Sequence, residues 1–324
     1  MNASAVLTDL VSIIVPVYQN EANLGETVPR LLALAPALAP LQLEIVFVND
    51  GSTDQSLALL TAAVAAYPAT IRVVCLTRNF GQTPAIQAGL RHARGACVGV
   101  ISCDLQEPPE ALVEMVAHWR RGAKFVIGER VAREEPRLTS GIYWLIVRRF
   151  VFADYPPLGF DCFLLDRQVV DSVNHINEKN TSIFVLIYWL GYKPVSVPVH
   201  RQLRKLGRSQ WRLAAKIRFT VNTLIGFSYA PARCITWLGL TTAIGSILYL
   251  LVLIWRWYSL RVAPPGWMTQ VGLTILLGAM ILFALGIISE YLLRILDEAR
   301  KRPPFEVERV IEQPGNQRQG SGLT

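Results

Sequence analysis

Two long apolar stretches constrain this chain more than any other feature of its sequence. Residues Cys234 to Ile254 contain no charged side chain over 21 positions, and Met268 to Ile288 match that length with one Gln. About 20 apolar residues cross the hydrocarbon core of a bilayer, and a soluble core helix of that length and uniform apolarity is unusual. A short loop containing Pro264-Pro265-Gly266 separates the stretches. We therefore predict a transmembrane helical hairpin whose two ends lie on the same side of the membrane.

Charge is distributed unevenly around these stretches. The chain has a net charge of +8, yet no Asp or Glu occurs between Glu178 and Glu290. A basic block precedes the first stretch, which suits anionic headgroups or phosphates, although a solvated basic face is the plain alternative. We recognise no nucleic-acid-binding module and predict no nucleic-acid partner. The block and the basic residues after the second stretch predict a cytoplasmic location for both flanks, which Arg256 and Arg261 in the loop weaken. The block consists of Arg201, Arg204, Lys205, Arg208, Arg212, Lys216 and Arg218.

The first half of the chain has the alternating pattern of an α/β domain. Apolar β-branched runs predict strands, and the segments Leu57 to Ala66 and Thr83 to Ala93 predict helices between them. This alternation indicates a mainly parallel sheet covered by helices on both faces. Ligands bind beyond the carboxyl ends of such strands, where Asp50, Arg78 and Asp104 would gather. The predicted strands are Ser12 to Tyr18, Leu43 to Val48, Ile71 to Leu76 and Ala96 to Cys103.

Three further segments give weaker expectations. Residues Trp211 to Phe227 alternate aromatic and basic residues, which favours amphipathic helices at the membrane interface over an ordinary helix packed on the soluble domain. The tail after Pro303-Pro304 is predicted to become disordered. No signal peptide is visible at residues 1 to 9, so we expect the catalytic portion to stay in the cytosol. The cysteines have no metal-ligand spacing and are expected to be small buried thiols of a reducing compartment: Cys75, Cys97, Cys103, Cys162 and Cys234.

An acidic run follows the fourth predicted strand. Asp104-Leu105-Gln106-Glu107 places oxygen ligands where Mg²⁺ or Mn²⁺ could bind together with substrate phosphates. Taken alone, such a run is better explained as an ordinary turn at a strand end.

The neighbouring motifs favour the metal-binding interpretation. The chain resembles the family 2, GT-A-type glycosyltransferases, and within them it is most similar to the dolichol-phosphate and undecaprenyl-phosphate sugar synthases. The resemblance covers nearly the whole chain in order. It rests on PVYQNEANL from Pro16, VNDGSTD from Val48, RNFGQTPAIQAGL from Arg78, CDLQEPPE from Cys103, IGERVAREEPR from Ile127, RQLRKLGRSQW from Arg201 and SEYLLRILDEARKRPPFEV from Ser289.

The resemblance implies a group of residues that bind the nucleotide-sugar. Pro16, Tyr18 and Glu21 match the motif around the base and ribose, Asp50 matches the carboxylate that recognises the base, and Arg78 opens the third motif. The plain alternatives are that Pro16 only ends a strand, Tyr18 is a core residue and Glu21 caps a helix.

The resemblance also implies residues for the reaction. Asp104 matches the metal-binding Asp of the D-x-D signature, and Gln106 matches the amide that assists it. Arg130 and Arg133 match basic residues near the donor diphosphate and the acceptor phosphate, and Asp161 matches an Asp near the reacting centre.

The motif before the membrane is expected to contact the acceptor phosphate and the bilayer through Arg201, Arg204, Lys205 and Ser209.

Three positions depart from the family pattern. Ser102 stands where the first Asp of D-x-D is usual, Cys162-Phe163 follows Asp161 where an Arg is common, and Gln210 replaces a frequent Lys. These changes leave the donor and the details of acceptor binding open.

From these features we predict an inverting enzyme that moves a sugar, from a UDP-sugar more readily than a GDP-sugar, to polyprenyl phosphate such as undecaprenyl phosphate at the inner membrane. The product would serve the assembly or modification of a cell-surface glycan. The alternatives are a family 2 enzyme with another lipid or glycan acceptor, and a non-catalytic membrane scaffold. Glycines in the spans could support a homo-oligomer, namely Gly239, Gly245, Gly272 and Gly278.

The expected organisation has six segments. They are a GT-A domain (1–210), amphipathic juxtamembrane helices (211–231), a first transmembrane helix (232–256), a short external loop (257–267), a second transmembrane helix (268–293) and a cytosolic tail (294–324).

Overall fold

The computed structural model describes residues 7–130, 145, 147–157, 159–176, 182–201, 220, 223, 225–260 and 266–313. The chain divides into two compact units. The first contains residues 1–219 and 303–324, and the second contains residues 220–302.

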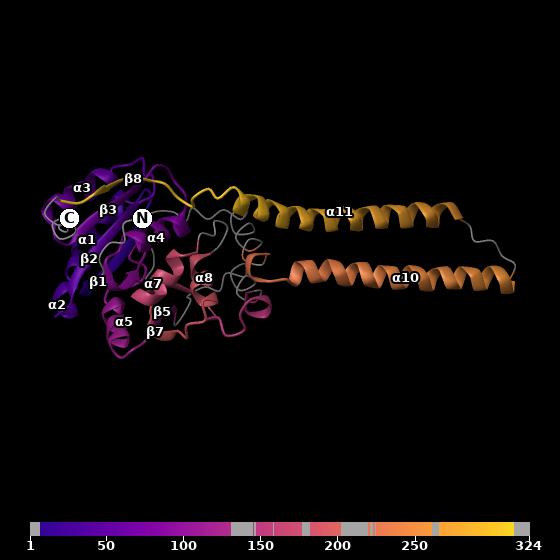
Figure 1. Ribbon diagram of the computed structural model, residues 1–324, viewed down its shortest axis with the longest axis horizontal. Coiled ribbons are helices and arrows are strands. Elements are labelled where there is room, and N and C mark those ends of the chain that lie inside the picture. The colour runs from indigo at the N-terminus through magenta and orange to yellow at the C-terminus, as the bar shows by residue number, and fades with distance from the viewer. Residues whose placement is uncertain are drawn as a thin grey trace, which may run out of the picture. The chain divides into compact units, whose positions relative to one another are not determined.

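A single mixed sheet forms the centre of the first unit (Figure 1). Its described strands lie in the order β7-β5-β6-β4-β1-β2-β3-β8. The pairs β1–β2, β1–β4, β2–β3 and β5–β7 are parallel, whereas β4–β6, β5–β6 and β3–β8 are antiparallel. The strands are β1 (Leu7–Val17), β2 (Gln42–Asn49), β3 (Ile71–Leu76), β4 (Gly95–Val100), β5 (Phe125–Arg130), β6 (Phe160–Asp166), β7 (Val195–Val199) and β8 (Val307–Ile311).

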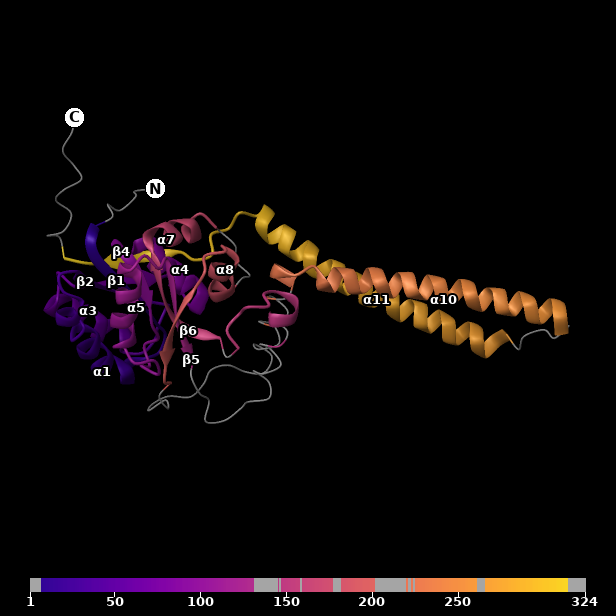
Figure 2. The same cartoon turned by 90° about the horizontal axis from the view of Figure 1, so that it is seen from below.

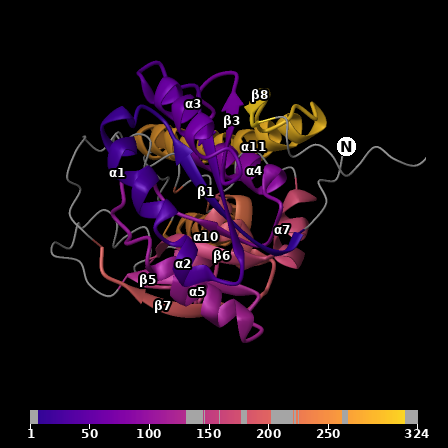
Figure 3. The ribbon, with the colours of Figure 1, turned by 90° about the vertical axis from the view of Figure 1, so that its left-hand side faces the viewer.

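Helices cover both faces of this sheet, as the sequence predicts. Successive strand residues point to opposite faces. Ile13 and Phe47 lie in a buried apolar cluster with residues of α1 (Glu21–Leu32), α2 (Ala35–Leu38), α3 (Ser56–Ala66) and α5 (Ala111–Arg120). On the opposite face, α4 (Gln82–His92) packs so closely on β1 that a Cβ at Gly89 would overlap the Ile14 side chain. Figure 3 shows α1 and α4 on opposite sides of β1. Helix α4 packs in turn with α7 (Arg167–Asn174) and α8 (Ile183–Trp189).

The predicted elements of the first half are present with small differences at their ends. Strand β4 ends at Val100, three residues before the predicted end at Cys103, because the chain turns there and Leu105 N–H donates to Ser102 O at 3.4 Å. Four of the five cysteines are buried free thiols, as expected. Burial raises the pKa of Cys103 and of Cys162 to about 12. The expectation of burial is wrong for Cys234, which is exposed on its helix.

The predicted disorder of the tail is wrong for residues 307 to 311. These residues form β8, an edge strand that pairs antiparallel with β3. Their sequence, VERVI, has the β-branched alternation of a strand, but the preceding Pro303-Pro304 and the polar residues that follow obscured it. The sheet partner supplies hydrogen bonds that an isolated five-residue segment lacks.

The second unit contains two long apolar helices, α10 (Ala230–Leu260) and α11 (Gly266–Ala299). They run side by side in Figures 1 and 2, and Thr242 Oγ1 lies 3.5 Å from Met280 Sδ. The most apolar 18-residue windows within residues 230–256 and 270–299 have mean hydropathies of 2.1 and 2.6, and none of either window is buried within the protein. Core helices of soluble proteins bury such side chains, so both helices have the length, composition and exposure expected of membrane spans. Most of the predicted amphipathic segment 211–227 lies outside the described residues.

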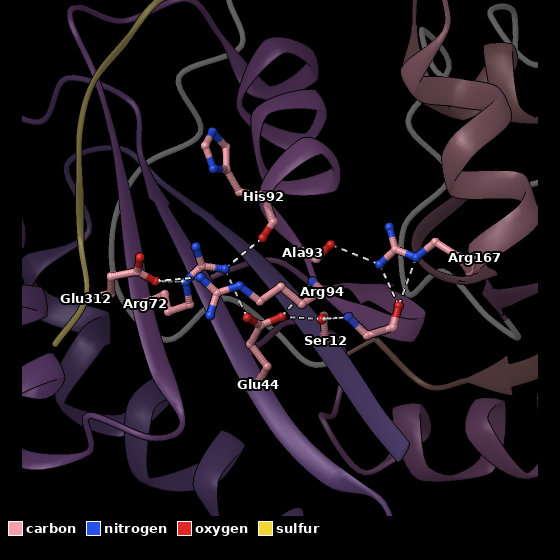
Figure 4. A network of polar contacts seen from close by, with 9 residues as sticks. Ser12, Glu44, Arg72, His92, Ala93, Arg94, Arg167 and Glu312 are labelled. Atoms are coloured by element: carbon pink, nitrogen blue, oxygen red, sulfur yellow. Dashed lines mark hydrogen bonds and ion pairs between the residues drawn. The ribbon is translucent and has the colours of Figure 1, made fainter. Parts of the chain in front are cut away.

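A buried ion network ties β8 to the amino ends of β2 and β3 (Figure 4). Arg72 lies 3.1 Å from Glu44 and 2.8 Å from Glu312, and Arg94 lies 2.9 Å from Glu312. Glu44 also accepts hydrogen bonds from Ser12 Oγ and, at 3.0 Å, from the backbone N–H of Arg94. The Arg72 and Glu44 side chains are only 8% and 6% exposed. Each charge therefore depends on its partners for the stabilisation that water would otherwise supply.

We predict that Glu44→Gln destabilises the first unit by about 3 kcal/mol, because it leaves the Arg72 guanidinium buried with reduced compensation. Thermal unfolding of the purified full-length protein in detergent measures this change, and the midpoint should fall by roughly 6 °C or more.

Glu308→Gln is the matched control. The Glu308 side chain is 54% exposed and its ion pair with the adjacent Arg309 is 4.0 Å long, so its loss should cost under about 0.5 kcal/mol. Equal melting temperatures for the Glu44 variant and the control would show that the network contributes nothing to stability.

Candidate active site

The order of the strands defines where the candidate site lies. Strand β2, which follows β1 in the sequence, pairs with one side of β1, and β4 pairs with the other side. Strands β1 and β4 part after Ile14, whose carbonyl accepts the last bond from Ile101 N–H at 3.1 Å. Pro16, which has no N–H to donate, follows at the point where β1 no longer pairs with β4. Ligands of doubly wound sheets bind at such a switch point, beyond the carboxyl ends of the strands.

Asp50 holds together the loops that follow β2 and β3. Its two carboxylate oxygens accept the backbone N–H groups of Phe80 at 2.7 Å and Gly81 at 2.8 Å. Burial raises the pKa of Asp50, and these hydrogen bonds, together with the charge of Arg78, only partly offset it. Asp50 and Arg78 therefore belong to one loop pair, as the strand ends predict.

A second pair of contacts joins the loops after β1 and β2. Glu21 N–H donates to Asp54 at 3.2 Å, and the Glu21 carboxylate accepts Gln55 N–H, the N-cap residue of α3, at 2.9 Å. Burial alone would raise the pKa of Asp54, but hydrogen bonds from Ser56 and from the Glu21 N–H outweigh it and lower that pKa. The Glu21 carboxylate thus caps a neighbouring helix in addition to any role toward a ligand.

The remaining predicted nucleotide-side residues lie near these loops. Tyr18 directly follows β1 and is half-buried. Arg78 is exposed, and its guanidinium carbon lies 4.0 Å from the centre of the Phe80 ring. Such a flat cation on an aromatic ring presents a planar surface suited to stacking or phosphate contacts.

The acidic run after β4 forms a compact turn. Leu105 adopts the left-handed region with φ of 51°, which is costly for a bulky residue and is frequent at functional sites. Gln106 N–H lies 3.4 Å from Asp104 Oδ1, and Ser102 Oγ lies 2.9 Å from the same oxygen. Ser102 Oγ also lies 2.6 Å from Glu107 Oε2. Ser102 therefore fills the position of the usual first Asp with a hydroxyl that lies within hydrogen-bonding distance of two carboxylates and donates its one proton to one of them at a time.

Two arginines, one at the end of β5 and one just after β7, contact Asp161 beside this turn. Arg130 closes β5 and forms an ion pair with Asp161 on β6. Arg201 lies 3.6 Å from Asp161 and 2.5 Å from the Gln106 amide oxygen. The structure thus brings Asp104, Gln106, Asp161, Arg130 and Arg201 into one network, although their positions in the chain span nearly a hundred residues.

Glu107 is central to this network although it is not among the site residues predicted from the sequence. The sequence feature that could have identified Glu107 is its position in the acidic run from Asp104. Four of the predicted residues lie outside the described part of the chain: Arg133, Arg204, Lys205 and Ser209.

The donor atoms at the turn fit a hard divalent cation. No group of three or more His, Cys, Asp or Glu side chains among the described residues could hold a metal ion by itself. One carboxylate and one amide oxygen, from Asp104 and Gln106, match the sparse protein ligation of Mg²⁺, which also takes waters and substrate phosphates.

The mixed sheet, with helices on both faces and polar groups at its switch point, has the architecture of the GT-A fold. The family model "Glycosyl transferase family 2" matches residues 12–181, and this chain belongs to that family. It is accordingly a glycosyltransferase.

Three relatives match over nearly their full lengths. An uncharacterised glycosyltransferase of Synechocystis is 33% identical, covering 93% of this chain and 95% of the relative. An uncharacterised glycosyltransferase of Bacillus subtilis is 30% identical, covering 92% and 93%. The undecaprenyl-phosphate 4-deoxy-4-formamido-L-arabinose transferase of an Enterobacter is 30% identical, covering 93% of each chain.

Among solved structures, the glucosyl-3-phosphoglycerate synthase of Mycobacterium tuberculosis has a TM-score of 0.51 and 18% identity, covering 68% of this chain and 80% of the synthase. This likeness supports the fold.

We predict that Gly51→Ala disrupts the loop pair held by Asp50. Gly51 has φ of +65°, and a Cβ there would lie 2.5 Å from the Arg78 carbonyl carbon, which is backbone and cannot rotate away. The variant should lose about 1–3 kcal/mol of stability, as measured by thermal unfolding.

Gly25→Ala is the control, because a Cβ added to this helical glycine of α1 would have nothing within 4 Å and Ala favours helices. Equal melting temperatures for the Gly51 and Gly25 variants would contradict the steric role of Gly51 in this loop pair.

Proposed function

We propose that this glycosyltransferase moves a sugar from a UDP-sugar to polyprenyl phosphate, with undecaprenyl phosphate as the acceptor, and makes a lipid-linked monosaccharide for a cell-surface glycan. The full-length relative from Enterobacter carries an undecaprenyl-phosphate transferase name. The two long, exposed apolar helices are suited to a lipid acceptor, because polyprenyl chains are insoluble and only their phosphate heads reach water.

One observation carries the proposal. The turn that contains Asp104 and Gln106 is joined through Arg201 and Asp161 to Arg130. Oxygen ligands for a cation thus lie beside guanidinium groups that suit phosphates, in the same chain as the apolar helices. A diphosphate leaving group and an acceptor phosphate both need such positive charge.

The donor side is assigned to the residues at the ends of β1, β2 and β3. Asp50 is proposed to recognise the base, while Pro16, Tyr18, Glu21 and Arg78 surround the nucleotide. The mycobacterial synthase with the same fold was solved with UDP and Mn²⁺. Asp104 and Gln106 would hold Mg²⁺ or Mn²⁺, and the bound cation supplies charge that stabilises the departing nucleoside diphosphate.

The acceptor supplies its own nucleophile. A phosphate monoester has a second pKa of about 6 and is largely ionised near pH 7, so it needs no strong general base. Catalysis then rests on positioning and on charge stabilisation by Arg130 and Arg133. Asp161, held by Arg130, orients the reacting groups, and direct displacement gives inversion at the anomeric carbon.

The membrane arrangement follows from the same proposal. Helices α10 and α11 span the inner membrane as a hairpin with both flanks in the cytosol, and Arg201, Arg204, Lys205 and Ser209 meet the acceptor phosphate at the interface. A homo-oligomer is proposed through the helix glycines, where an added Cβ would meet nothing within 4 Å, namely Gly239, Gly245, Gly272 and Gly278.

A radiolabelled transfer assay tests the reaction. Membranes that contain the protein are incubated with undecaprenyl phosphate, Mg²⁺ or Mn²⁺ and a panel of UDP- and GDP-sugars. An acid-labile, metal-dependent lipid product from one donor is expected and would identify the sugar. Transfer from that donor to a different lipid or to a glycan, with none to polyprenyl phosphate, would overturn the acceptor assignment.

We predict that Asp104→Asn lowers transfer at least a hundredfold while leaving the melting temperature within about 2 °C of the wild type, since one cation-binding carboxylate is lost and the shape is kept.

Asp171→Asn, an exposed position on α7 at the other end of the sheet, removes one carboxylate far from the turn and should retain full activity. Full activity in the Asp104 variant would refute its role in metal binding.

A further inference from the structure

Arg201 has an unusual set of partners for an arginine assigned to an acceptor phosphate. It directly follows His200 at the end of β7, and its side chain points back into the acidic turn. Its Nη2 donates to Gln106 Oε1 at 2.5 Å, its Nη1 lies 3.6 Å from Asp161 Oδ2, and its Nε lies 3.5 Å from Glu107 Oε1. The guanidinium therefore faces three oxygen-bearing side chains from two separate segments.

The buried carboxylate of Glu107 requires a positive charge, such as the Arg201 guanidinium, beside it. Its side chain is only 3% exposed. Oxygen Oε2 accepts from Ser102 at 2.6 Å, whereas Oε1 is buried, accepts no hydrogen bond among the described residues and faces Arg201. A buried carboxylate oxygen without a hydrogen bond is costly unless a positive charge lies beside it. Arg201 is the described side chain that supplies this charge.

The same oxygens are those that a divalent cation would use or face. The Gln106 amide oxygen that Arg201 holds is the proposed metal ligand, and Asp104 lies in the same turn, 2.9 Å from the hydroxyl of Ser102. A guanidinium hydrogen-bonded to an amide oxygen takes one of its two lone pairs and places a positive charge beside the other, where a cation would bind. A single positive charge also repels a divalent cation strongly at a distance of a few ångströms.

We propose that Arg201 is an internal counter-ion of the acidic turn, and that Arg201 and the divalent cation bind there in competition. Arg201 leaves the Gln106 oxygen when the cation and donor bind. The competition stands on the geometry alone. Its consequence rests on the proposed function: the released guanidinium becomes available to the acceptor phosphate only after the donor site is filled, which orders the two substrates.

The test is a titration of the purified full-length protein in detergent with Mn²⁺, followed by the electron paramagnetic resonance signal of the free ion. Arg201→Gln should bind Mn²⁺ roughly tenfold more tightly than the wild type, because it removes a competing unit charge from the site. A residue that only binds the acceptor, or only stabilises the site, would leave Mn²⁺ affinity unchanged or weaken it.

Two controls locate the effect. Arg121→Gln removes the same charge from an exposed turn after α5 and should change the Mn²⁺ affinity less than about twofold. Adding Asp104→Asn to the Arg201→Gln variant should abolish the tighter binding, which places the ion at the acidic turn. Mn²⁺ affinity that is equal or weaker in Arg201→Gln, or no Mn²⁺ binding to any of the proteins, would overturn the proposal.

A second measurement uses the wild-type protein and so does not depend on the folding of a variant. Trypsin must draw the Arg201 side chain into its own pocket to cut the bond to Gln202. Saturating Mn²⁺ should therefore increase the rate of this cut, measured by mass spectrometry, at least threefold, while metal-free buffer of equal ionic strength should not. An unchanged or slower rate would contradict release of Arg201.

These readouts are independent of transfer. If no lipid product forms but Mn²⁺ binds more tightly to the Arg201 variant, then the competition holds and the proposed acceptor fails. If transfer occurs but Mn²⁺ affinity is unaffected by Arg201, then the function holds and the counter-ion role fails.

Discussion

The parallel pairing of β1 with β2 on one side and with β4 on the other determines where the candidate residues after β1, β2 and β4 lie. Because the chain reverses its direction of strand addition at β1, the ends of β1 and β4 separate after Ile14 and Ile101. The loops at this opening cannot pair with each other as strands, so the polar groups on each side bond among themselves. Asp50 and Glu21 tie the loops on one side, and the turn from Ser102 to Glu107 forms the other.

At the β8 edge of the same sheet, charge pairing stabilises a short strand. The chain leaves the first unit for the apolar helices and returns as β8, an edge strand of only five residues. Such a short strand has little apolar area to bury. Glu312, directly after it, joins Arg72 and Arg94 in a shielded network, so charge pairing in a low-dielectric setting adds what burial does not supply. The network around Glu312 thus contributes to stability, whereas the polar groups beyond the carboxyl ends of β1, β2 and β4 form the candidate site.

Much of the active-site edge could be predicted from the sequence, and the reasons are local. A β-branched run followed by Asp or Arg predicts both a strand and the side of the sheet on which the charge lies, which placed Asp50, Arg78 and Asp104 correctly at one edge. The role of Glu107 was not predictable in this way. Its burial depends on Ser102 and on Arg201, which lies nearly a hundred residues away, and no sequence spacing reveals that contact. The strand β8 was missed for the same reason, since its stability comes from β3.

The sequence by itself determined the periodic features of this protein: an α/β domain with a mainly parallel sheet, two apolar helices long enough for a bilayer, and the motifs of a family 2 glycosyltransferase. These follow from short-range patterns of apolar and polar residues, each of which is complete within about 20 positions. Only the tertiary structure decided which charges meet. Ion pairs such as Arg130 with Asp161, or Arg72 with Glu312, depend on strand order and on burial, because the energy of a charge pair depends on distance and on the surrounding dielectric and not on separation along the chain.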